Sequence, residues 1–274
     1  MWHAYAPFMK PYETLVIVVV AVLATAGCVH IIENPGTSDE PERIGIIGAM
    51  DAEVSALKSA MHIDRKETVE SMEFCVGKLR GCDVVVVQCG MGKVNAGTCA
   101  QLLVTKFNAR AIINTGVAGS LDDCLNIGDF VVSTDAVQHD FDVSPIGFQK
   151  GEIPYTEKYA FEADATLRQK AFDAISKNTT GVKVYEGRIC SGDQFVSTVE
   201  QKETITAAFG GMCCEMEGAA IAQVCYLNNV PFVVIRTVSD KADGTAPSDF
   251  EEFTKEAAAR SSAVVLYFLE NESP

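Results

Sequence analysis

The feature that most constrains the fold of this chain is a series of short, continuously apolar runs that alternate with segments of helical spacing. The first run, RIGIIGA, begins at Arg43, and it is followed by Val54, Leu57 and Met61 at helical spacing. The later runs are ARAIINTG, GDFVVSTDAV and VPFVVIRTVSD. Runs that are apolar at every position are typical of strands buried on both faces. The pattern therefore predicts an α/β fold, a three-layer α/β/α sandwich around a central sheet.

One tight turn and four helical segments complete the predicted architecture. FCVGKL and DVVVVQC flank Arg80-Gly81, which predicts two consecutive strands paired as a hairpin and so makes the central sheet mixed. We expect helices over four ranges, Asn95–Phe107, Asp164–Lys177, Glu217–Leu227 and Phe250–Leu269.

The segment 1–42 differs from the rest of the chain. Residues 15–29 form an apolar run that has the length of a signal-peptide hydrophobic region and is short for a membrane span of about 20 residues. The run ends in TAGC, which resembles a bacterial lipobox, so we expect export with lipid attachment at Cys28. A retained membrane anchor and a mis-chosen start codon, with a cytoplasmic protein, are the alternatives. A polar stretch with Pro and Gly then predicts a linker, and we place one catalytic domain at 43–274.

The formal charge of −15 at pH 7 excludes one large class of partners. Proteins that bind nucleic acids need a Lys- and Arg-rich surface that displaces counterions from phosphates, so we expect no DNA or RNA partner. The ten cysteines show neither CxxC nor Cys/His spacing, and we expect them to pack as small apolar side chains. His139 and Asp140 in QHDFD lack the paired spacing of a metal site, so we assign no metal to them.

Several predicted strands end in glycine or small polar residues, as in GAM, CGMG, NTGVAG and VSD. Ligands of α/β sheets bind outside the carboxyl ends of strands, so these ends indicate one cleft. Glu53, Glu217 and Asp240 lie where apolar segments give way to other elements, although each taken singly is better explained as a helix-start or surface carboxylate. Neither GxGxxG after the first strand nor GxxxxGK[ST] is present, which disfavours a dinucleotide or P-loop site.

Seven ordered segments carry a resemblance that spans nearly all of residues 43–270. They are IGIIGAMDAEV, CGMGKVNAG, AIINTGVAGSL, IGDFVVSTDAVQHDFDV, SGDQFV, CEMEGAAIAQVC and VPFVVIRTVSDKAD. In this order they are similar to the 5′-methylthioadenosine/S-adenosylhomocysteine nucleosidases, a family of the nucleoside phosphorylase fold group. The resemblance implies a nucleoside phosphorylase-like fold and hydrolysis of the N-glycosidic bond of adenine nucleosides that carry a thioether at the ribose 5′ carbon.

The resemblance also implies the roles of the catalytic residues. Asp240 would protonate or hydrogen-bond N7 of the adenine, oriented by Ser239, and its pKa would have to be raised for it to donate a proton at neutral pH. Glu217 would accept hydrogen bonds from the ribose hydroxyls and favour the cationic sugar of the transition state. Glu53 would activate the attacking water, and Arg236 would hold that water or Glu53 through a charge-assisted contact.

The remaining expected site residues contact the substrate. Phe195 would stack on the purine, and an apolar channel for the 5′-thio group would combine Phe250 with residues from across a dimer interface. The full set comprises Met50, Val117, Ala118, Phe195, Val196, Glu215, Met216 and Phe250 of one chain, with Val143, Ile146 and Phe148 of its partner. The resemblance thus implies a homodimer that acts on small adenine nucleosides without a cofactor.

Two alternative functions stay open on sequence alone. A nucleoside phosphorylase of the same fold would need a cationic cradle for phosphate, yet the first loop offers Asp51 and Glu53 and the GMGK segment only Lys93. A non-catalytic nucleoside-binding protein would have no need to keep Glu53, Glu217 and Asp240 together. The 5′ substituent is also open between methylthioadenosine, S-adenosylhomocysteine, 5′-deoxyadenosine and aminodeoxyfutalosine.

Overall fold

The computed structural model describes residues 41–156 and 158–270. The predicted leader, with Cys28, lies outside the described residues, so its lipid attachment stays a prediction. Within the described ranges, no helix combines the length and the apolar character that crossing a membrane would require.

The described chain alternates strands and helices. The strands are β1 (Arg43–Gly48), β2 (His62–Val69), β3 (Met72–Leu79), β4 (Cys82–Gln88), β5 (Ala109–Ser120), β6 (Phe130–Gln138), β7 (Phe161–Glu162), β8 (Val184–Ser191), β9 (Cys213–Glu215) and β10 (Phe232–Asp240). The helices are α2 (Asp51–Ala60), α3 (Lys93–Thr105), α4 (Ala165–Asn178), α5 (Val199–Phe209), α6 (Gly218–Asn228) and α7 (Ala246–Glu270), with a short 3-10 helix η1 (Ser144–Ile146).

A mixed sheet forms the centre of this part of the chain, as expected. β1 lies between β4 and β5 and runs parallel to both, and β3 pairs antiparallel with β4 through the predicted hairpin. At the other end the sheet closes on itself, because β5, β10, β6, β8 and β9 pair in a ring that returns to β5. The apolar pattern did not predict this ring, since β9 has only three residues and β8 is only partly buried.

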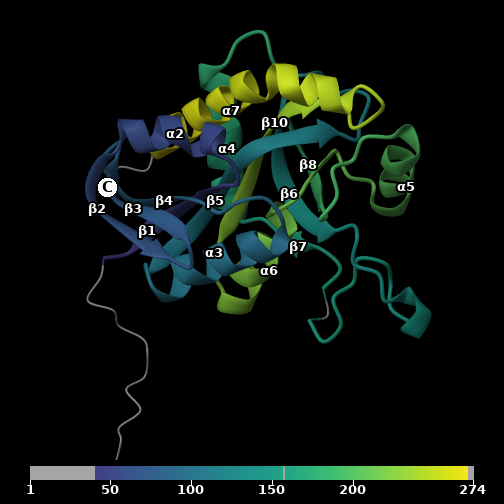
Figure 1. Ribbon diagram of the computed structural model, residues 1–274, viewed down its shortest axis with the longest axis horizontal. Helices are drawn as coiled ribbons and strands as arrows, with labels where there is room; N and C mark the ends of the chain where they lie inside the picture. Colours follow the sequence, from purple (N-terminus) through teal and green to yellow (C-terminus); the bar gives the residue numbers. More distant parts are fainter. Residues whose placement is uncertain (1–40, 157, 271–274) are drawn as a thin grey trace, which may run out of the picture. The chain divides into compact units, whose positions relative to one another are not determined.

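Helices cover both faces of the sheet (Figure 1). Helices α2, α4 and α7 lie on one face, and α3 and α6 lie side by side on the other. The valine run of β4 shows why its sequence is continuously apolar. Val84 and Val86 pack in one hydrophobic cluster with Phe268 of α7, whereas Val85 and Val87 pack in another with Leu103 of α3. Successive strand residues therefore each enter one of two cores.

The four predicted helices are confirmed, with shifted ends. α7 begins at Ala246 rather than at Phe250, and Pro247 falls in its first turn, where a residue without an N–H removes no helical hydrogen bond. Six of the described elements had no counterpart in the prediction, namely β2, β7, β8, β9, α5 and η1. β2 is mostly exposed and polar, and α5 buries only Ile205 and Phe209, so neither shows a strong apolar period.

Candidate active site

Three strands of the ring bring their ends together. Gly119 of β5 pairs with Asp240 of β10 on one side and with Cys214 of β9 on the other. A side chain at Gly119 would meet the Asp240 Oδ1 at 2.7 Å and the Ala242 Cβ at 3.0 Å. The glycine therefore allows the carboxyl group of Asp240 to pack directly against the neighbouring strand.

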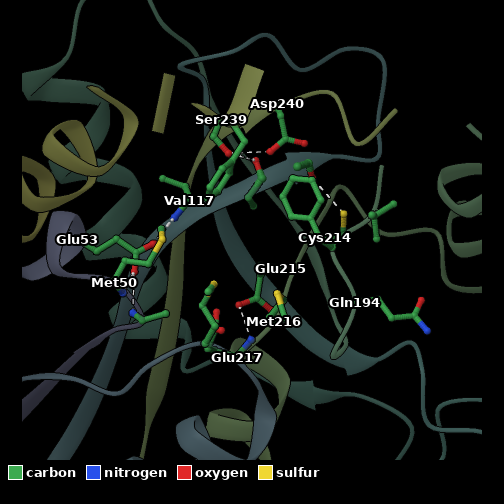
Figure 2. Close-up of a pocket in the computed structure, with 17 residues that line it drawn as sticks. Met50, Glu53, Val117, Gln194, Cys214, Glu215, Met216, Glu217, Ser239 and Asp240 are labelled. Carbon is green, nitrogen blue, oxygen red and sulfur yellow. Dashed lines mark hydrogen bonds between the residues drawn. The ribbon is translucent and has the colours of Figure 1, made fainter. Parts of the chain in front are cut away.

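A cavity of about 550 Å³, including its open mouth, lies at these strand ends (Figure 2). Most residues expected to bind substrate line it: Met50, Glu53, Val117, Ala118, Phe195, Val196, Glu215, Met216, Glu217, Ser239, Asp240 and Phe250. Ala49, Met91, Gly119, Gln194 and Cys214 also line it and were not among the expected site residues. All five lie either in the glycine-containing strand ends or in the seven segments that resemble the nucleosidase family, and this position in the sequence is the feature that could have indicated them.

Glu53 belongs to the first turn of α2 and is buried. Its Oε2 accepts hydrogen bonds from the Ala49 and Met50 amides at 2.7 and 2.9 Å, and its Oε1 accepts one from the Val117 amide at 3.0 Å. Burial raises the pKa of Glu53, and the Arg236 charge and these three amides limit the rise. The arrangement holds a carboxylate of increased basicity beside the cavity.

Asp240 is the last residue of β10 and is also buried. The Ser239 hydroxyl donates to its Oδ2 at 2.9 Å, as the sequence predicted, and the Ala242 amide donates to its Oδ1 at 2.9 Å. Burial raises the pKa of Asp240 in spite of these two donors, and the negative charges of Asp249 and Asp243 raise it further. The shift has the direction that a general acid at neutral pH requires.

Glu215 and Glu217, which line the cavity, form a buried charge cluster with Arg236, which does not. Glu215 is held by an ion pair with Arg236 Nη2, by the Ser191 hydroxyl and by the Gly218 amide at 2.8 Å. Glu217 lies 4.0 Å from Arg236 Nη2. Burial raises the pKa of Glu217 to about 8, and the Glu215 charge adds to the rise. Both carboxyl groups lie near the Arg236 guanidinium, but only Glu215 is close enough for a short ion pair. The Arg236 charge therefore lowers the pKa of Glu217 by less than burial raises it.

The helix α3 holds the second of these carboxylates. The Gly92 amide, at the N-cap of α3, donates to Glu217 Oε1 at 2.8 Å. This hydrogen bond, together with the positive end of the helix dipole, fixes the Glu217 carboxyl group at the edge of the cavity. Figure 2 shows Glu53, Glu217 and Asp240 on three sides of the cavity.

Comparisons with known proteins agree with this geometry. A model of the phosphorylase superfamily matches residues 43–270. A 5′-methylthioadenosine/S-adenosylhomocysteine nucleosidase of Staphylococcus haemolyticus is 44% identical over 223 residues, which cover 81% of this chain and 96% of that protein. The chain belongs to this nucleosidase family.

Solved structures of similar proteins support the same conclusion. The nucleosidase of Neisseria meningitidis, in complex with methylthio-immucillin-A, superimposes with a TM-score of 0.81 and 36% identity, covering 84% of this chain and all of that one. A futalosine hydrolase of Helicobacter pylori has a TM-score of 0.79 and 31% identity, covering 84% and 98%. The nucleosidase fold predicted from the resemblance is therefore confirmed.

Arg236 differs from its expected contacts. It does not line the cavity, and its closest acidic partner is Glu215 rather than Glu53. A second hydrogen bond of 2.6 Å reaches Asn114 Oδ1, and the side chain is almost fully buried. Of the two expected contacts, the one with Glu53 is not a direct ion pair, and the one with the attacking water stays a prediction. The charge of Arg236 still acts on Glu53 at longer range.

The three residues expected from a partner subunit lie away from this cavity of the single chain. Val143, Ile146 and Phe148 belong to the segment around η1, and Ile146 is 73% exposed. Their contribution to the channel of another nucleosidase subunit stays a prediction.

The cysteines follow the expected pattern with one exception. Eight of the nine described cysteines are buried free thiols, and burial raises the pKa of those in the core, such as Cys99 and Cys225. Cys124 is exposed because it lies in the loop before β6. Across the described ranges no His, Cys, Asp and Glu cluster has the arrangement of a metal site.

Gly116 provides the space in which Glu53 and Arg236 approach each other. A Cβ there would lie 2.5 Å from Glu53 Oε1 and 3.2 Å from Arg236 Nη1. Gly116→Ala should therefore displace the Glu53 carboxyl group and lower nucleosidase kcat roughly 100-fold, the effect of a misplacement of about 1 Å. Steady-state adenine release measures it. Gly244→Ala, which meets open space, is the matched control, and equal activity of both variants would contradict the role of Gly116.

The raised pKa of Glu217 predicts how stability changes with pH. Because the folded protein binds this proton more tightly than the unfolded chain, the stability that the neutral carboxyl contributes is lost as the pH rises from about 4.5 through about 8. Glu217→Gln cannot ionise and keeps an acceptor for the Gly92 amide. The difference between the Tm of Glu217→Gln and the Tm of the wild type should therefore become more positive from pH 5 to pH 9, as measured by thermal melts. A difference that is constant across this range would contradict the shift.

Proposed function

We propose that the chain hydrolyses the N-glycosidic bond of 5′-methylthioadenosine and S-adenosylhomocysteine, and so releases adenine and the 5′-substituted ribose. The observation that carries the proposal is the convergence of Glu53, Glu217 and Asp240 on one cavity, each buried and each with a raised pKa. Because the chain belongs to the nucleosidase family, we assign all three groups to the hydrolysis of one N-glycosidic bond.

The base binds at the Asp240 end of the cavity. Gly119 lies beside Asp240, and Phe195 and Val196 line the same cavity, where Phe195 offers an aromatic face for stacking on the purine. The protonated Asp240 donates to N7 as the C1′–N9 bond breaks. The bond's electron pair goes to N9, and the added proton makes the leaving adenine neutral.

The sugar and the water occupy the other end. Glu217 accepts from the ribose hydroxyls, and Met50 and Met216 place the anomeric carbon. Glu53 takes a proton from a water molecule while the water oxygen forms the new bond to C1′. In its ionised form, the Glu217 carboxylate stabilises the positive charge that develops on the ribose.

Water rather than phosphate fits this cavity. Its described lining contains no Lys or Arg. Lys93 of the GMGK segment donates to Asp140 and Gln138, Lys241 donates to the Leu125 carbonyl, and Arg236 forms an ion pair with Glu215. A phosphate dianion would therefore meet Glu53 and Glu217 without a neutralising partner.

The substrate range is tested with a panel of four nucleosides. Methylthioadenosine, S-adenosylhomocysteine, 5′-deoxyadenosine and aminodeoxyfutalosine share the base and the ribose, and the similarity to a futalosine hydrolase justifies including the last. We expect adenine release from the first two, followed by liquid chromatography. No adenine from any of the four would refute the proposed function.

Assembly and location are further parts of the proposal. We infer a homodimer from the half-exposed Phe195 at the cavity mouth and the exposed Ile146 on the η1 segment, and size-exclusion chromatography with light scattering tests it. We also infer export with lipid attachment at Cys28, for which a globomycin-sensitive shift in size is the test. Recovery of the full chain in the soluble cytosol would overturn the second inference.

A further inference from the structure

Three segments that are distant in sequence meet through charged residues outside the catalytic set. They carry Lys93 at the start of α3, Asp140 after β6, and Asp193 after β8. Lys93 Nζ donates to Asp140 Oδ1 at 2.5 Å, and the Asp193 amide donates to Asp140 Oδ2 at 2.8 Å. The Lys93 amide in turn donates to Asp193 Oδ1 at 2.8 Å, so that the three residues form a closed hydrogen-bond network.

This network differs from an ordinary surface ion pair. The Lys93 and Asp140 side chains are only 18% and 17% exposed, so solvent screens their attraction less than it screens an open pair. Burial raises the pKa of Asp140, yet the Lys93 ammonium and the Asp193 amide outweigh it and hold that pKa below its usual range. The Asp140 carboxylate stays charged and uses both oxygens in the network.

Asp193 is fixed from two directions. Its amide is bound to Asp140 and its carboxylate to the Lys93 amide, the residue next to Gly92, whose own amide holds Glu217. Asp193 is thereby attached to the same end of α3 that positions a catalytic carboxylate. Without the Asp193 carboxylate, the Lys93 amide would lose its acceptor at the helix start.

The residues that follow Asp193 reach the base. Gln194, Phe195 and Val196 line the cavity, but Phe195 is 43% exposed, and its ring packs edge-to-face with Phe250, with centroids 5.4 Å apart. Figure 2 shows the Gln194 side chain pointing away from the cavity. Val196 is buried in an apolar cluster and fixes one end of the Phe195 segment, so the hydrogen bonds at Asp193 are what fix its other end.

We propose that Asp193, held by the Lys93–Asp140 pair, is a positioning residue that sets the Phe195 segment for stacking on the purine. The inference rests on the proposed function, since it assigns the cavity an adenine base. Asp193 and Asp140 do not touch the substrate; they fix where Phe195 lies before the substrate arrives, and so reduce the ordering that binding would otherwise require.

The test compares Asp193→Ala with Asp193→Asn. Asp193→Ala removes the acceptor of the Lys93 amide, and we expect KM for methylthioadenosine and Kd for adenine to rise roughly ten-fold, the loss of about one hydrogen bond, while kcat changes much less. Asp193→Asn keeps a carbonyl oxygen for that amide and should restore most of the affinity. Steady-state kinetics gives KM and kcat, and calorimetry with adenine gives Kd.

A matched control and an ordered set of outcomes keep the test decisive. Asp173→Ala removes an exposed ion pair with Lys177 on α4 and should leave KM, Kd and kcat unchanged. Lys93→Met serves as a second variant and should raise KM and Kd in the same sense as Asp193→Ala. A wild-type protein that releases no adenine would refute the proposed function. An active wild type with unaltered Kd in Asp193→Ala, or a loss confined to kcat, would overturn the inference itself.

Discussion

Replacing Asp240 by asparagine is expected to lower kcat for methylthioadenosine by about 10³-fold, within the range that one general acid contributes, while nucleoside binding stays measurable. The amide has the size of the carboxyl group and can still accept from the Ser239 hydroxyl or the Ala242 amide, but it has no proton to give to N7. Adenine release measures kcat, and calorimetry with adenine measures binding. The loss should therefore appear in the chemical step rather than in affinity.

The matched control is Asp243→Asn. Asp243 lies three residues further on, contacts Thr245 through its side chain and is half-buried outside the cavity. This variant should keep near wild-type turnover, with a slightly lower pKa at Asp240 because one negative charge is removed. Unchanged turnover in Asp240→Asn would count against Asp240 as the acid.

Replacing Glu53 by glutamine is the second change with a large expected effect. The carboxylate accepts three amide hydrogen bonds, and a glutamine can match them only in part, because in either orientation its NH₂ group faces a backbone N–H. We expect kcat to fall about 10²- to 10⁴-fold through loss of the base, with a lower Tm from the unsatisfied amides. Stopped assays of adenine release and thermal melts measure the two effects.

An exposed glutamate provides the control for this change. Glu252→Gln lies on the surface of α7 and should alter neither kcat nor Tm. If Glu53→Gln lowered only Tm and kept its kcat, Glu53 would be a helix-capping residue and another group would have to activate the water.

The apolar pattern predicted the layers of the fold because burial on both faces leaves a direct trace in the sequence. In β4 every valine from Val84 to Val87 enters one core or the other, so the strand is apolar throughout. The closure of the sheet left no such trace, since it depends on β9, a strand of three residues. Pairing between strands that are distant in sequence has no local signature when the strands are short.

The catalytic carboxylates show a similar limit. Glu53, Glu217 and Asp240 resemble ordinary helix-start acids locally, and only the fold shows that all three are buried around one cavity. Their raised pKa values result from that burial, which spacing does not reveal. The pair Asp140 and Asp193 was out of reach for the same reason, because the hydrogen bond between them joins positions 53 residues apart.

The central claim is that water attacks the anomeric carbon, and the source of the new oxygen tests it most directly. The wild-type protein is incubated with methylthioadenosine in ¹⁸O-labelled water that contains inorganic phosphate, and the sugar product is analysed by mass spectrometry. We predict free methylthioribose that carries the label, together with one equivalent of adenine. An unlabelled sugar 1-phosphate would contradict the account and assign the chain to the phosphorylases.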